Sequence, residues 1–110
     1  MTEEINLQRL LAKLEQLPIE SFSWNGDNFN VTIEDFEIQF NADRCGISFS
    51  SFYIDVIHYG QPLKRISSEK SSDSNEYEQL VQTYNRIHEK RSAYVNRRNE
   101  ELTKKLNDLL

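Results

Sequence analysis

The stretch FSWNGDNFNVTIEDFEIQF, residues 22–40, decides the fold of this 110-residue chain. Apolar and polar side chains alternate along it, which is typical of β-strands with one buried face. A two-residue turn at Gly26–Asp27, with glycine in the first position, would place Trp24 opposite Phe29. The stretch therefore predicts a β-hairpin whose two strands share one apolar face.

A second turn, at Glu34–Asp35, continues the pattern into a third strand. If this turn has two residues, Ile33 lies opposite Phe36 and Val31 lies opposite Ile38. Glu-Asp is not an ideal pair for such a turn, so a longer turn stays open as an alternative. In the two-residue register one face carries eight apolar residues, namely Phe22, Trp24, Phe29, Val31, Ile33, Phe36, Ile38 and Phe40.

The meander is predicted to cover residues 21–58. A loop over 41–46 precedes a further apolar stretch, in which the alternation changes phase at Ser50–Ser51. Such a change indicates either a β-bulge or a break into two strands. With a turn after His58 and a polar loop over 67–73, the sheet is expected to have three to five strands.

Helices are predicted at both ends of the chain. Leucines at helical spacing over residues 1–18 indicate a short first helix, and Pro18 ends it. Residues 74–110 contain no glycine or proline and predict one long helix. That helix would be about 55 Å long, whereas a strand spans about 20 Å. We therefore expect one α+β domain over 1–110, with the long helix packed on the sheet and overhanging it.

An apolar stripe runs along the whole predicted C-terminal helix, so something has to cover the overhang. Either the first helix folds back antiparallel along residues 95–110, or a second copy of the chain supplies the cover. Near-heptad spacing permits a coiled coil, and a homodimer is the favoured prediction. The expected partner interface contains Arg91, Tyr94, Arg98, Leu102, Leu106 and Leu109. Alternatively, Arg91 and Arg98 lay their alkyl chains on the core and reach acidic groups of the same chain.

Four cations lie on the opposite side of this helix, at Arg86, Lys90, Arg97 and Lys104. They are candidates for contacts to a nucleic-acid backbone. Glu78, Glu89 and Glu100 form a row beside them, which favours a solvated face instead. Nucleic-acid binding is therefore the alternative and not the preferred prediction.

Negative charge gathers in the first part of the chain. Residues 1–62 carry 10 acidic and 3 basic side chains, a net charge of −7. Glu34, Asp35 and Glu37 form a candidate acidic docking edge near one hairpin end. A second alternative is therefore an acidic protein that imitates nucleic acid and inhibits a nucleic-acid enzyme.

Nothing in the sequence indicates catalysis. His58 and His88 are far apart, Cys45 is the single cysteine, and no metal-ligand or nucleotide-binding motif occurs. We expect no enzyme activity, no cofactor and no metal. Without an apolar run of membrane-spanning length or a signal-like start, a cytoplasmic protein is expected. The predicted function is non-catalytic protein binding, as an adaptor, a chaperone-like protein or an inhibitor.

Overall fold

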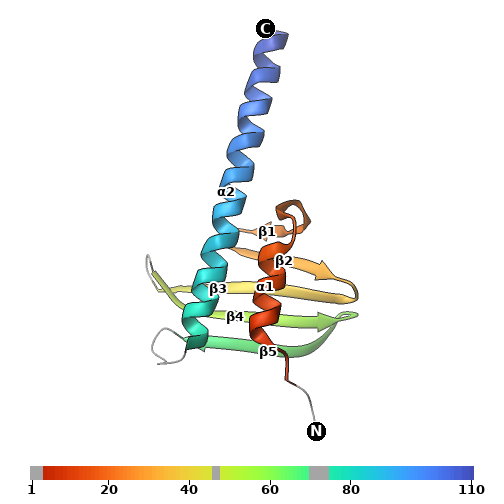
Figure 1. Cartoon of the computed structure of the whole chain (residues 1–110), viewed down its shortest axis with the longest axis vertical. Coiled ribbons are helices and arrows are strands. Elements are labelled where there is room, and N and C mark those ends of the chain that lie inside the picture. The colour runs from red at the N-terminus through yellow and green to blue at the C-terminus, as the bar shows by residue number, and fades with distance from the viewer. Residues whose placement is uncertain (1–3, 46–47, 70–74) are drawn as a thin grey trace.

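A computed structural model describes residues 4–45, 48–69 and 75–110. Five antiparallel strands form one sheet in the order β1-β2-β3-β4-β5. Helices α1 (Leu7–Gln16) and α2 (Asn75–Leu109) lie side by side on one face of this sheet (Figure 1), which confirms the predicted α+β fold. The strands are β1 (Ser23–Asn25), β2 (Asn28–Ile33), β3 (Phe36–Cys45), β4 (Ser48–His58) and β5 (Gln61–Glu69), and the 3₁₀ helix η1 (Ile19–Ser21) precedes them.

The first two hairpins have the predicted register. Trp24 pairs with Phe29 across the turn at Gly26–Asp27, and Ile33 pairs with Phe36 across the turn at Glu34–Asp35. Both turns therefore have two residues. Phe22, which the predicted register places on the same apolar face, lies outside the ladder because β1 begins at Ser23, although the Phe22 ring still packs edge-on against Phe29.

The connection predicted over residues 41–46 is wrong, because β3 continues to Cys45. Strand β4 pairs with it along this length, so the backbone of residues 41–45 takes part in the ladder. Asn28 also accepts a hydrogen bond from the backbone N–H of Ala42, at 3.0 Å. The bulge predicted at the serines is confirmed, since Asp43 pairs with Ser51 and Arg44 pairs with Phe49, which leaves Ser50 unpaired.

Strand β5 was missed by the sequence analysis, which ended the meander at residue 58. Tyr59 and Gly60 both have positive φ values, of 47° and 79°, as a tight two-residue hairpin turn requires. Residues 67–69 of the predicted polar loop belong to this strand, and residues 70–73 lie outside the described part of the chain. The strand gave no alternating signal because it is an edge strand with most side chains exposed.

The first helix is shorter than the predicted 1–18. It begins after Asn6, whose side-chain oxygen accepts a hydrogen bond from the N–H of Arg9 at 3.1 Å. It ends at Gln16, and Leu17 is extended because the next residue is Pro18. The six residues between α1 and β1 keep this helix above the sheet.

Helix α1 runs parallel to the N-terminal half of α2 (Figure 1). Its Glu15 contacts Thr83 and Arg86. The alternative in which the first helix folds back antiparallel along residues 95–110 is therefore wrong. Because its buried leucines, Leu11 and Leu14, pack in the core above the sheet, α1 cannot cover the overhang as well.

One hydrophobic core lies between the sheet and the two helices. The helices contribute buried residues from α1 and from the first four turns of α2, and the sheet contributes buried residues from β2, β3 and β4. The buried apolar residues are Leu11, Leu14, Phe22, Phe29, Val31, Ile38, Phe40, Phe52, Ile54, Val56, Leu80, Tyr84 and Ile87. Beyond the core every residue of α2 from Val95 onward is exposed, so the predicted overhang is confirmed.

Glu34 occupies the first position of its turn with φ at 55°, a backbone region that favours glycine. We expect Glu34→Gly to raise the free energy of unfolding by about 1 kcal/mol because it removes this strain. Chemical denaturation measures the change. Asp35→Gly is the matched control: it lacks the positive φ and is expected to lower stability by a few tenths to about 1 kcal/mol. A loss of stability in Glu34→Gly would contradict the expected result.

Candidate functional site

The exposed apolar face of the α2 overhang is the main candidate surface. Val95 is 40% exposed, Leu102 51%, Leu106 55% and Leu109 76%. These four residues, which we call the C-terminal seam, recur at intervals of three, four or seven and so lie on one side of the helix. Three of them, the leucines, belong to the predicted partner interface. The structure places them together and away from the core.

The β1–β2 turn marks where α2 leaves the body of the protein. The hydroxyl of Tyr84 donates a hydrogen bond to the carbonyl oxygen of Asp27 at 2.9 Å, and Nε2 of His88 lies 3.1 Å from the same oxygen. Because a carbonyl oxygen can only accept, His88 carries a proton on Nε2. Arg91 donates to the carbonyl oxygen of Gly26 at 3.4 Å. The sequence did not predict these contacts between α2 and the β1–β2 turn, although residues 84, 88 and 91 share one helix face.

Arg91 also lies over the ring of Trp24, with its guanidinium carbon 4.1 Å from the ring centroid. A guanidinium at this distance makes a favourable cation–π contact. Arg91, one of the predicted interface residues, therefore packs on the body of the protein. This is the alternative in which its alkyl chain lies on the core, but its guanidinium group reaches a carbonyl group and an indole ring and not an acidic side chain. Tyr94 is half-buried just above it, and Arg98 is exposed on the overhang.

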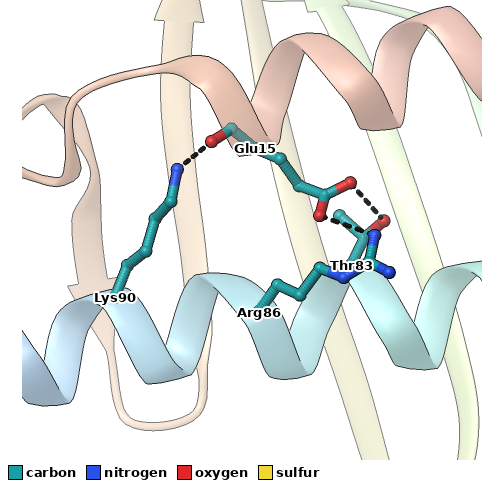
Figure 2. Close-up of polar contacts among 4 residues, drawn as sticks. All are labelled: Glu15, Thr83, Arg86 and Lys90. Atoms are coloured by element: carbon teal, nitrogen blue, oxygen red, sulfur yellow. Dashed lines mark hydrogen bonds and ion pairs between the residues drawn. The ribbon is translucent and has the colours of Figure 1, made fainter.

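Two of the four predicted nucleic-acid contacts are engaged by α1 (Figure 2). Arg86 forms an ion pair with the Glu15 carboxylate at 3.0 Å, and Thr83 donates to its other oxygen at 3.4 Å. Lys90 donates to the backbone carbonyl of Glu15. The other two cations, Arg97 and Lys104, are exposed on the overhang. Nucleic-acid binding stays a prediction; Arg86 and Lys90 are exposed as well, but both already have a partner on α1.

The three acidic residues predicted as a docking edge occupy two different places. Glu34 and Asp35 are exposed in the β2–β3 turn. Glu37 is half-buried on β3, where it accepts a hydrogen bond from Gln39 at 3.1 Å. Because Glu37 alternates with the buried Ile38, it faces the sheet surface that the helices do not cover. That the protein imitates nucleic acid stays a prediction, and the three carboxylates of its proposed docking edge lie less close together than the sequence predicted.

A polar cluster on the uncovered sheet face was also missed. Arg65 of β5 binds both carboxylate oxygens of Asp55 of β4, at 2.6 and 3.0 Å. Its guanidinium carbon lies 4.6 Å from the ring centroid of Tyr53. The hydrogen bond and the charge of Asp55 raise the pKa of Arg65 above its ordinary value. The cluster fastens the edge strand β5 to β4, which is a structural role.

Within residues 4–45, 48–69 and 75–110, no three His, Cys, Asp or Glu side chains are grouped so that they could hold a metal ion. In the same part of the chain, neither helix combines the length and the apolar character needed to cross a membrane. Comparisons with protein-family models, with curated proteins and with solved structures find no match for this chain. The candidate function therefore has to be argued from the surfaces themselves.

Proposed function

We propose that this protein is a non-catalytic protein-binding module that assembles as a homodimer through its C-terminal seam. The carrying observation is the seam itself: four apolar side chains, 40–76% exposed, on a helix whose last fifteen residues are all exposed. A helix that served only to cover the sheet would not need to continue past the β1–β2 turn. Apolar residues repeated on one side of an exposed helix are typical of a surface that a partner helix covers.

The energetics allow a dimer of moderate stability. Burying a leucine or valine fully contributes about 1.5–3 kcal/mol, and these side chains are already about half covered. Eight of them from two copies would contribute on the order of 10 kcal/mol. The cost of association is about 4–15 kcal/mol, so a surplus remains only near the lower end of that range, where it is about 6 kcal/mol. We therefore expect a weak dimer, with a dissociation constant of roughly tens of micromolar, that exchanges its subunits.

The body of the protein remains free to bind another partner in such a dimer. The sheet face opposite the helices is uncovered (Figure 1) and carries Glu37, and the Glu34–Asp35 turn adds two exposed carboxylates at its end. Carboxylates at an exposed edge select partners with positively charged surfaces. We assign assembly to the seam and partner choice to this acidic region, which is the arrangement of an adaptor or inhibitor protein.

The test is the molar mass of the protein as a function of concentration. The parent chain is expected to rise toward the dimer mass between about 10 and 500 micromolar in light scattering or sedimentation. Leu102→Asp/Leu106→Asp is expected to remain a monomer with an unchanged fold, because charge cannot be buried in the seam without a large penalty.

Arg97→Gln/Lys104→Gln is the matched control, since it makes the same change of −2 in net charge on the same overhang, on the side opposite the seam. It is expected to dimerise as the parent does. A parent chain that stays monomeric throughout this range would overturn the proposal, and so would a dimer that survives both aspartates in the seam.

A further inference from the structure

We propose that the second copy binds the C-terminal seam with its helix antiparallel, so that the two bodies lie at opposite ends of the paired helices. This inference rests on the proposed function, because it takes the seam to be a self-association surface, and it adds the orientation of the partner. Three features carry it: the direction in which the seam faces, the charges along its flanks, and the length of the overhang.

The seam faces the same side as the β1–β2 turn. At 100° per residue, the four seam residues fall within about 60° of one another. Tyr84, His88 and Arg91 fall in the same sector, and these are the side chains that contact the turn. The seam thus continues the body-facing side of α2 beyond the body.

This direction excludes a parallel pair. In a parallel pair two helices lie 8–10 Å apart along their shared length. The partner's helix would then have to pass through the space that the β1–β2 turn already occupies beside residues 84–91. In an antiparallel pair the partner's helix ends where the body begins, so the space beside the seam is free (Figure 1).

The flanks of the seam favour the same orientation. One flank carries Arg98 and Lys105 together with Glu101 and Asp108, whereas the other is composed mainly of amides and a threonine, at Asn96, Asn99, Thr103 and Asn107. A two-fold axis relating antiparallel helices brings like flanks together with their order reversed. Arg98 then lies level with the partner's Asp108, and Lys105 with the partner's Glu101. A parallel pair would instead set the charged flank against the amide flank and form no such pairs.

The length of the overhang sets where the bodies lie. From Arg91, the last residue bound to the turn, to Leu109 the helix rises about 27 Å. In the register of these charge pairs, Leu109 lies level with the partner's Arg97, so each tip ends about 9 Å along the helix axis from the partner's Arg91. The assembly presents two identical sheet faces, one at each end of a short helical rod.

The orientation is tested by measuring the distance between spin labels on the two copies. Cys45→Ser/Glu89→Cys places one label on the exposed side of α2, at a position where Glu89 is exposed. In the antiparallel pair the two labels are expected to lie about 40 Å apart along the helix axis. In a parallel pair they would lie within about 20 Å. Dilution with unlabelled protein shows that the measured coupling joins different copies.

Each outcome has a separate meaning when the mass of the same labelled sample is recorded. A dimer with a distance near 40 Å supports the antiparallel pair. A dimer with the short distance overturns the orientation and leaves the homodimer standing. A monomer, or a dimer whose distance is unchanged by Leu102→Asp/Leu106→Asp, overturns both the orientation and the proposed function.

Discussion

Phe40→Ala is expected to lower the free energy of unfolding by about 3–5 kcal/mol. Phe40 has no exposed surface and lies at the centre of the aromatic core. Its ring centroid is 5.1 Å from that of Phe29, 5.7 Å from Tyr84 and 6.1 Å from Phe52. The substitution leaves a cavity between the sheet and α2. Because small domains have a total stability of about 5–15 kcal/mol, this single change takes the protein close to unfolding. Urea denaturation followed by circular dichroism measures the loss.

Phe36→Ala is the matched control for this experiment. Phe36 lies on the same strand and the same face as Phe40, but it is 38% exposed at the rim of the sheet. The same change of side chain there is expected to cost about 1 kcal/mol. Equal losses at the two positions would show that Phe40 does not occupy the centre of the core.

Leu14→Ala is expected to lower the free energy of unfolding by about 2–5 kcal/mol. Leu14 is 1% exposed and is one of two fully covered leucines through which α1 packs in the core. A helix of ten residues is not stable by itself in water, so α1 depends on this packing. The variant is also expected to expose α1 to proteases before the sheet opens. Proteolysis under native conditions, with mass spectrometry of the fragments, detects that effect.

Leu10→Ala provides the comparison within the same helix. Leu10 is half-buried and packs at the margin of the core. Its replacement is expected to cost about 1 kcal/mol and to leave the protease pattern unchanged. If both leucine variants lost α1 at the same protease concentration, the special position of Leu14 would be disproved.

The hairpins could be predicted residue by residue because two independent signals agreed. Turn residues fixed where the chain reverses, and the alternation of apolar residues fixed which side chains share a face, so pairs such as Val31 with Ile38 followed. Strand β5 gave only the first of these signals. A turn was predicted after His58, but the first five side chains of the strand are all exposed and show no alternation of buried and exposed residues. An edge strand is held in place by backbone hydrogen bonds to the neighbouring strand, and the sequence of the edge strand itself does not reveal them.

The candidate surfaces show the same limit of prediction from the sequence. The leucines of the seam could be placed from periodicity alone, because a helix places its residues regularly. Arg86 and Lys90 were placed on the outer face of a helix considered by itself, and the structure puts α1 on that face. Glu15, which binds both, gave a weak signal as an acid near the end of the first helix. Periodicity describes one element, and it does not say which neighbour covers it.

The continuity of α2 ties the existence of the seam to the folding of the whole domain. Helix formation requires a costly first turn, after which each added residue is cheap. In α2 the core supplies that nucleus at Leu80, Tyr84 and Ile87, and the exposed turns beyond Arg91 extend from it. In a chain whose sheet has unfolded, the core no longer nucleates α2, and the seam side chains no longer lie on one side of a helix. In the proposed dimer, only correctly folded copies would therefore display the seam, so assembly would select against damaged subunits without any separate means of recognising them.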